Sequence, residues 1–311
     1  MIGSTGNTGA SNANRVGSVA STFATALAFW GGGIGAWAYS SGGYRSMYSP
    51  SQWVGKQPVV GQALIIPAVL LAVGSSALVV NRIGSVFLRL VEGDWPTWMV
   101  PLHHRLVARQ TRRARAQDRA WEQAQRDFES SPTLTARLVV TRDVLTRRRR
   151  YRPAYPNYLL PTKVGNILRA AEIRVLEKYG LANDVVWPRI LLVLPEPAAS
   201  QVTAARSALD SAVATVVWGL LFCVFAALTP LVVPIGLAIA AIALLVVVPA
   251  RVRALTDLME SVYDLHREAL YRQLRWPVPV NPAEDRAQGV RLSDYLRKGS
   301  NATEPLFTVS F

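Results

Sequence analysis

Residues 211–250 read SAVATVVWGLLFCVFAALTPLVVPIGLAIAAIALLVVVPA, and none of these forty side chains is charged. A helix that crosses a bilayer needs about 20 apolar residues, so this stretch is long enough for two crossings. Thr229 and Pro230 lie at its middle. Because proline at a lipid-facing helix centre would leave backbone groups unpaired, we expect a tight turn there. The stretch therefore predicts a transmembrane hairpin over 209–250, with helices at about 210–229 and 231–250.

Two further windows without charge, residues 16–44 and 57–81, each have room for one crossing. We place these crossings at about 18–40 and 60–81. A soluble protein with buried helices is the alternative, but core helices rarely run 20 residues without a polar face. A cleaved signal peptide is a second alternative. The long apolar run after Arg15 favours an uncleaved anchor instead.

The composition agrees with a membrane protein, because 50% of the residues are hydrophobic and only 17% are charged. Soluble domains usually carry about 25% charged residues. The sequence therefore predicts an all-α membrane protein with four transmembrane helices in two hairpins, at 18–81 and 209–250.

The basic residues are concentrated in the segment between the hairpins. Residues 82–208 hold 22 Lys and Arg against 11 acids, whereas residues 1–17 hold one and residues 41–58 hold two. Loops rich in Lys and Arg stay on the cytoplasmic side. We therefore predict a multi-pass protein of a bacterial plasma membrane with both termini in the cytoplasm. The cytoplasmic parts are a disordered N-terminus (1–17), a basic helical domain (82–208) and a C-terminal segment (251–311).

Local signals outline helices in the cytoplasmic parts. A polar helix is expected at 104–129, and a second begins with Ser131 as its N-cap and ends at the arginines near residue 150. Thr162 and Gly180 are the expected caps of a third helix. VVWPRILLVLP, residues 185–195, suits a buried strand or a short helix.

The C-terminal segment predicts an amphipathic helix at 251–275, whose apolar stripe consists of Leu255, Leu258, Val262, Leu265 and Leu270. Asn281 caps a short final helix, which Gly289 interrupts. The last dozen residues are expected to be loosely ordered.

A run of arginines, RRRRYR at residues 147–152, is the strongest local charge. It predicts a contact with anionic inner-leaflet lipids or with an acidic partner, made by Arg147, Arg148, Arg149, Arg150 and Arg152. The alternative is a solvated helix end, because cations suit the C-terminus of a helix dipole. Nucleic acid is disfavoured as the partner, since 11 acids are interspersed through the same segment.

Gly31 and Gly35 form a GxxxG pair in the first crossing. Such pairs let helix backbones approach closely. We predict helix packing within one chain at these glycines, with the contact of a homo-oligomer as the alternative.

Residue patterns that carry catalysis are absent from the sequence. It has no Walker loop, GxGxxG, HExxH or GxSxG pattern. His103 and His104 are adjacent and point about 100° apart on a helix, so they do not form a metal pair. We therefore expect no enzyme activity, no cofactor and no metal. No ionisable side chain lies within any predicted crossing, which disfavours a pump.

Three stretches resemble multi-pass membrane proteins of high-GC Gram-positive (actinobacterial) bacteria, which have no agreed activity. They are LVEGDWP (90–96), LLPTKVGNILRAAE (159–172) and KYGLANDVVWPRILLVLPE (178–196). The group's pattern is EGxWP, then LPTxxGNxLRAAE, then YGL with WPR. Ile190 stands where Leu is usual. The resemblance implies a membrane protein and transfers no catalytic residue.

Most of the information in the sequence lies in the cytoplasmic parts. We therefore expect a non-enzymatic membrane adaptor that recruits a cytoplasmic protein partner. A phage-tail-like contractile injection particle is one such partner, expected from the bacterial group and not from any residue. The alternative is a subunit of an oligomeric channel or transport complex.

Overall fold

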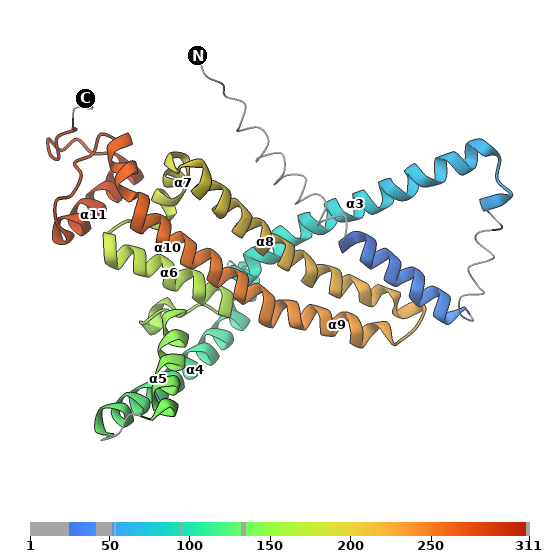
Figure 1. Cartoon of the computed structure of the whole chain (residues 1–311), viewed down its shortest axis with the longest axis horizontal. Coiled ribbons are helices and arrows are strands. Elements are labelled where there is room, and N and C mark those ends of the chain that lie inside the picture. The colour runs from blue at the N-terminus through green and yellow to red at the C-terminus, as the bar shows by residue number, and fades with distance from the viewer. Residues whose placement is uncertain (1–24, 42–51, 53, 94, 132–134, 309–311) are drawn as a thin grey trace, which may run out of the picture. The chain divides into compact units, whose positions relative to one another are not determined.

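The computed structural model describes residues 25–41, 52, 54–93, 95–131 and 135–308, and the regular elements in these residues are all helices. A first helix covers residues 25–40. The others, in chain order (Figure 1), are α3 (Val59–Glu92), η2 (Thr97–Met99), α4 (Val100–Ser130), α5 (Ala136–Arg150), η3 (Pro156–Tyr158), α6 (Lys163–Tyr179), α7 (Asn183–Val193), α8 (Glu196–Phe222), η4 (Cys223–Ala227), α9 (Val232–Ile242), η5 (Ala243–Val247), α10 (Val248–Gln273) and α11 (Pro282–Lys298).

Three of these helical stretches are long and apolar enough to cross a membrane. They are Val59–Glu92, Glu196–Ala227 and Val232–Gln273. The helix over 25–40 corresponds to the first predicted crossing, whose residues 18–24 lie outside the described residues. An all-helical protein with apolar helices of membrane-spanning length is therefore confirmed.

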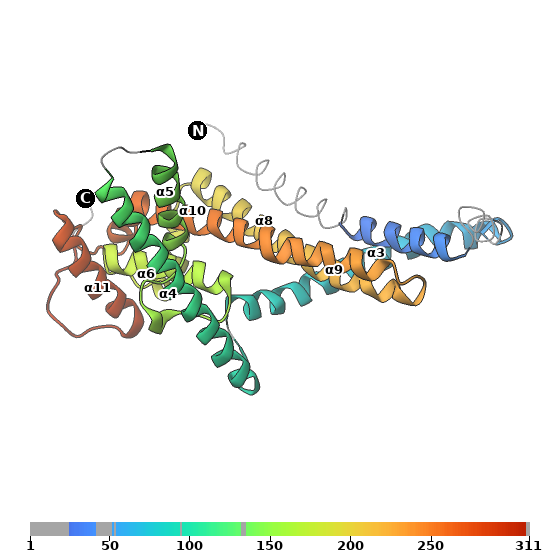
Figure 2. The same ribbon diagram turned by 90° about the horizontal axis from the view of Figure 1, so that it is seen from below.

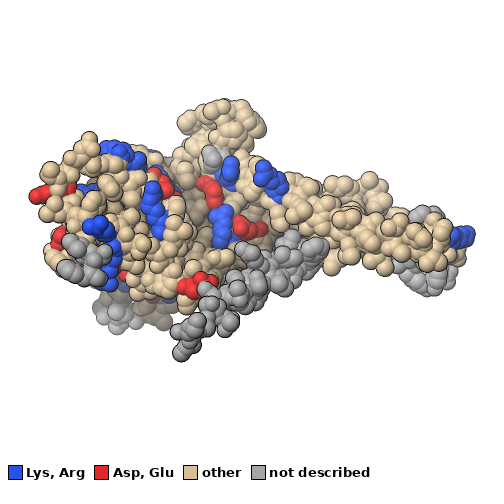
Figure 3. Space-filling view, turned by 90° about the horizontal axis from the view of Figure 1, so that it is seen from above, with Lys and Arg blue, Asp and Glu red and all other residues tan. Residues whose placement is uncertain are grey.

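The chain forms two compact units. Unit 1 consists of residues 1–88 and 204–251, and unit 2 of residues 89–203 and 252–311. On the face drawn in Figure 3, charged side chains of both signs are interspersed over unit 2, whereas the apolar helices of unit 1 show few.

Unit 1 has a small core where the helix over 25–40 packs between α3 and α8. The Phe29 ring lies 4.7 Å from the ring of Trp218, and Trp30 Nε1 donates to Ser76 Oγ at 3.2 Å. Only 17% of the most apolar 18-residue window of α3 is buried. An outward face of exposed leucine and valine is what lipid-facing helices require.

The predicted break near Thr229 and Pro230 is confirmed. The helix from α8 ends in η4, and a turn at residues 228–231 precedes α9. The two helices approach at glycines: a Cβ on Gly219 would lie 2.8 Å from Ala240 N, and one on Gly236 would lie 2.6 Å from Gly219 O. Close backbone approach through small residues is typical of helix packing in membranes.

Among the described residues, Gly31 and Gly35 have no neighbouring helix, so the packing predicted at these glycines stays a prediction. A Cβ on either would meet no described atom within 4 Å. The neighbouring Gly32 and Gly33 face α8 and η4 instead, where added methyl groups would press on the rings of Phe222 and Phe225. Gly32 and Gly33, which face a neighbouring helix, thus lie one and two positions after Gly31, the first glycine of the predicted pair.

Pro249 lies inside one continuous helix, because the helix widens just before it. Residues 243–247 form the π-type segment η5, and the Val248 N–H donates to Ala243 O. Pro249 has no N–H for the preceding turn, and a wider turn accommodates that loss.

Unit 2 has a core made by α6, α7, α10 and α11. Its largest fully buried side chains include Tyr263, Tyr271 and Leu292. Tyr263 OH donates to Asn183 Oδ1 at 3.0 Å, whereas Tyr271 OH has no hydrogen-bond partner among the described residues. The stretch 185–195, for which a strand was one alternative, belongs to helix α7 and the residues that follow it.

The predicted caps are largely confirmed. Thr162 Oγ1 accepts from Gly165 N, Gly180 has a φ of 68° at the end of α6, and Asn281 Oδ1 accepts from Glu284 N. The predicted start of α5 was wrong, because Thr135 is its N-cap and Ser131 is instead the C-cap of α4. A threonine four residues further along was an equally good N-cap.

Two other expectations for the C-terminal segment were wrong. Val262 and Leu270 of the predicted stripe are buried, but Leu265 is 75% exposed, because the buried side of α10 includes Tyr263 instead. The residues after α11 are also held: Thr308 N donates to Arg275 O at 2.7 Å, and the Phe307 ring packs near Trp276.

Gly289 does not interrupt α11 but lets it pack against the end of α6. A Cβ on Gly289 would overlap the Tyr179 carbonyl oxygen, and one on Gly180 would overlap that of Arg286. Ser293 Oγ accepts from Ala182 N at 2.9 Å and donates to Gly180 O at 3.2 Å. Two glycines and a serine thus join the two helices backbone to backbone.

Gly289→Ala tests this junction, because alanine normally stabilises a helix by about 1 kcal/mol relative to glycine. Here the methyl group meets a carbonyl that is part of another helix, so we expect a net loss of about 1–3 kcal/mol. Thermal unfolding of the full chain in detergent measures it. Gly35→Ala, whose methyl meets no described atom within 4 Å, is the control and should not lower the melting temperature. Equal stability of both variants would contradict the close packing.

Candidate functional site

The arginine run forms the last turn of α5. Arg147, Arg148, Arg149 and Arg150 are its final helical residues, and Tyr151 caps it. Positive charge at this end complements the partial negative charge of the unpaired carbonyls. The run therefore ends the helix where the sequence predicted.

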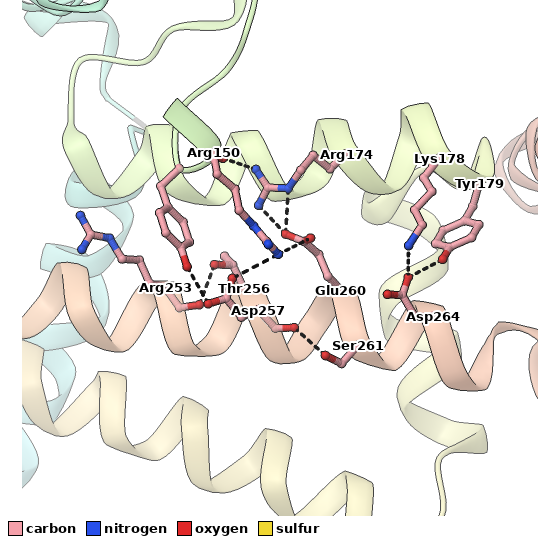
Figure 4. Close-up of polar contacts among 11 residues, drawn as sticks. Arg150, Arg174, Lys178, Tyr179, Arg253, Thr256, Asp257, Glu260, Ser261 and Asp264 are labelled. Carbon is pink, nitrogen blue, oxygen red and sulfur yellow. Dashed lines mark hydrogen bonds and ion pairs between the residues drawn. The ribbon is translucent and has the colours of Figure 1, made fainter. Parts of the chain in front are cut away.

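Arg150 is engaged inside unit 2. Its Nη2 lies 3.1 Å from Glu260 Oε2 and 3.7 Å from Asp257 Oδ1, both on α10. Arg174 on α6 donates from Nε to Glu260 Oε1 at 2.9 Å, and also binds the Arg150 carbonyl. Figure 4 shows these side chains converging between α6 and α10. Arg150 thus fixes the end of α5 to two helices.

Arg149 and Arg152 are engaged with α4. Both pair with Asp118, Arg149 at 3.3 Å and Arg152 with a side chain only 10% exposed. The Arg149 guanidinium also stacks 4.4 Å above the Trp121 ring, whose Nε1 donates to Thr146 Oγ1. These contacts close a hairpin of α4 and α5, which lie side by side (Figure 2).

Arg147 and Arg148 are the remaining members of the run. Both are exposed, and neither makes an ion pair or hydrogen bond with another described residue. The structure thus divides the five predicted contact residues into three that stabilise unit 2 and two that face outward. A contact with anionic lipid or an acidic partner stays a prediction, with Arg147 and Arg148 as its candidates.

Two further cations extend this basic surface, which we call the α5-end surface: Arg147, Arg148, Lys163 and Arg253. Lys163 begins α6 and Arg253 is on α10. Burial lowers the pKa of Lys163, and the charges of Arg253 and Arg148 lower it further. The Arg253 guanidinium lies 5.1 Å from the centre of the Tyr151 ring, which places it at the end of α5. Sequence reasoning missed Lys163 and Arg253, because nothing in their spacing places them beside residue 148.

A second polar row joins α6 to α10. Lys178 Nζ lies 2.7 Å from Asp264 Oδ1, and Tyr179 OH also donates to that carboxylate (Figure 4). Burial alone would raise the pKa of Asp264, but the hydrogen bonds from Lys178 and Tyr179 and nearby positive charges lower it overall. Asp264 is therefore ionised at neutral pH, and its role is to hold the two helices together.

The end of α3 is docked on the start of α6. Thr162 Oγ1 donates to Val91 O, and a Cβ on Gly165 would overlap Glu92 O. Asn166 closes a ring with Leu160, accepting from its N–H at 2.7 Å and donating to its carbonyl at 3.0 Å. A glycine in the first turn of a helix, where stronger helix formers are usual, was the signal in the sequence for this close contact.

Two of the three stretches that carry the resemblance therefore meet each other, and the third meets α11. LVEGDWP contacts LLPTKVGNILRAAE at the junction of α3 and α6, and Tyr179 and Gly180 contact α11. Beside the first junction is a pocket of about 400 Å³. Its charged lining includes Arg169 and Glu172, which pair with each other at 3.2 Å. The geometry gives these stretches a role in joining helices.

The histidines form no metal site in the described residues, which contain no group of three or more potential ligands. His103 and His104 lie with their ring centroids 5.8 Å apart. Comparisons with known proteins give no match: no family model, curated protein or solved structure is significantly similar to this chain.

The division of the arginine run predicts two different results from paired substitutions. Arg149→Gln with Arg150→Gln removes the contacts to Asp118 and Glu260, so we expect a loss of about 1–2 kcal/mol and a melting temperature lower by a few degrees. Arg147→Gln with Arg148→Gln removes no contact within unit 2 and should leave the melting temperature unchanged. Thermal unfolding of both variants in detergent decides it. The same loss in both pairs would show that the division is wrong.

Proposed function

We propose that this chain is a four-span plasma-membrane adaptor whose unit 2 recruits a cytoplasmic protein. The observation that carries the proposal is the shared core of unit 2, in which residues from before and after the second apolar hairpin pack together. Such a core gives the spans one folded module on a single side of the membrane. The excess of Lys and Arg in 82–208 favours the cytoplasmic side.

The same core constrains the number of crossings. Because α6 and α10 share it, the chain between them crosses the membrane an even number of times, and the apolar stretches Glu196–Ala227 and Val232–Gln273 are each long enough for one crossing. Helix α3 adds one more crossing, so the chain before Val59 lies outside. If the apolar segment at 18–40 also crosses, it returns the N-terminus to the cytoplasm, and the total is four crossings.

The expected partner is acidic at the surface that it presents. The α5-end surface holds cations that unit 2 itself leaves without carboxylates among the described residues, Arg147 and Arg148 above all. A large cytoplasmic assembly such as a contractile injection particle is the candidate that we carry forward. Nothing in the described geometry favours an enzyme.

A channel subunit is the second candidate. The face of Gly31 and Gly35 has no described neighbour within 4 Å, which suits a contact with another copy. A monomer in nanodiscs, with no ion flux in liposomes, would exclude this candidate.

Single cysteines test the topology, since Cys223 is the sole native cysteine. In a Cys223→Ala background, Gln57→Cys should react with a membrane-impermeant maleimide in spheroplasts. Ser4→Cys and Ser300→Cys should react only after permeabilisation. Labelling of Ser4→Cys from outside would reduce the number of crossings to three.

Purification of the full chain in mild detergent, followed by mass spectrometry, tests recruitment. We expect a soluble partner whose recovery falls several-fold in Arg147→Glu with Arg148→Glu. The control, Arg286→Glu with Arg291→Glu, makes the same change of charge on α11 and should retain the partner. If no soluble protein is enriched above an unrelated membrane protein, the adaptor proposal fails.

A further inference from the structure

Helix α4 carries a strongly basic face that is separate from the arginine run. Its six residues are Arg105, Arg109, Arg112, Arg113, Arg115 and Arg119, and all are exposed. At 3.6 residues per turn they fall within an arc of about 160°, over a length of about 21 Å. None makes an ion pair or hydrogen bond with a described residue. We call this set the α4 basic face.

The opposite face of α4 packs on α5. Ala114 and Ala124 are buried there, and Trp121 contacts the end of α5. Asp118 is the only acid between Val100 and Trp121, and it lies on this packed side, engaged by Arg149 and Arg152. Among the described residues no acid forms an ion pair with the α4 basic face, and Glu122, the nearest acid outside the packed side, lies beyond its C-terminal end.

This arrangement costs the free chain stability. Arginines four residues apart, such as Arg105 with Arg109 and Arg115 with Arg119, repel each other by a few tenths of a kcal/mol per pair. No packing contact compensates, because these side chains point away from α5. A surface of regularly spaced anions would relieve the repulsion.

Position along the chain favours a lipid surface over nucleic acid. The face begins 13 residues after Glu92, where an apolar helix of membrane-spanning length ends. Between them are exposed apolar side chains, Trp98 at 78% and Leu102 at 44%. Exposed tryptophan followed by arginine is typical of the interfacial region, and nucleic acid would leave these apolar groups in water.

We propose that the α4 basic face binds anionic phospholipid headgroups of the inner leaflet. The phosphates attract the six guanidinium groups, while Trp98 and Leu102 enter the headgroup region. The site rests on the proposed cytoplasmic placement of α4, but it requires no protein partner. Its failure is therefore distinguishable from the failure of recruitment.

A fluorophore on the face measures the contact in the full chain. In a Cys223→Ala background, Ala116→Cys places the label among the arginines, and Val140→Cys on α5 is the control site. Nanodiscs contain headgroup-quencher lipid with either phosphatidylcholine alone or added phosphatidylglycerol. We expect several-fold stronger quenching at residue 116 with phosphatidylglycerol, reversed by 0.5 M NaCl. At residue 140 the lipids should give equal, weak quenching.

Charge variants complete the test. Changing Arg105, Arg109 and Arg112 to Gln should lower the equilibrium constant for the contact by on the order of 100-fold. Lysine at the same three positions should restore it, since headgroup attraction depends on charge and not on a bidentate fit. Equal quenching in both lipids, or an unchanged glutamine variant, would overturn the proposal. Binding of an RNA or DNA oligonucleotide at residue 116 without any dependence on lipid would also overturn it.

Discussion

Backbone N–H and C=O groups inside a bilayer have no water to bond, so a chain that crosses it must form helices and keep its charges elsewhere. That constraint accounts for where charged residues and apolar helices occur along the sequence. The windows 57–81 and 211–250 carry no charge and form apolar helices, with the turn at Thr229 and Pro230. The other consequence is that nearly all of the charge falls in the segments of unit 2. Some arginines of these segments form ion pairs with carboxylates. Those without such a partner among the described residues form a basic surface.

Glycine decides how closely the helices pack, and this was harder to foresee. The pair of Gly31 and Gly35 follows a known pattern, yet the close approach occurs at Gly219 and Gly236. A pattern on one helix shows that a smooth face exists but not which helix lies against it. Gly289 is a second glycine whose helix contact could not be predicted from its own helix. Local propensity reads it as a break, whereas the Tyr179 carbonyl occupies the place of its side chain. Helices and most caps follow from local chemistry and could be predicted, whereas junctions depend on residues of different helices, which can lie more than 100 positions apart, as Gly180 and Gly289 do.

The arginine run illustrates the limit for charge. Counting residues identifies the run, but Arg150 pairs with Glu260, 110 residues away, and Arg149 pairs with Asp118 on the preceding helix. Three of the five therefore serve the fold. The arginines of α4 are spread over 15 residues and form no run, but the helical period gathers them on one face. The density of arginines along the sequence was thus a weaker guide to unpaired charge than their angular distribution around the helix.

The two basic surfaces point to a division of roles within unit 2. Helix α5 packs on the side of α4 that carries Asp118 and Trp121, so the α4 basic face lies on the other side of the hairpin. A headgroup layer against α4 would thus leave Arg147 and Arg148 accessible to a protein. Both contacts could form at once without competing for the same arginines. Holding α4 at the membrane would also restrict the orientations of the α5 end, and a pre-oriented surface loses less entropy when a partner binds.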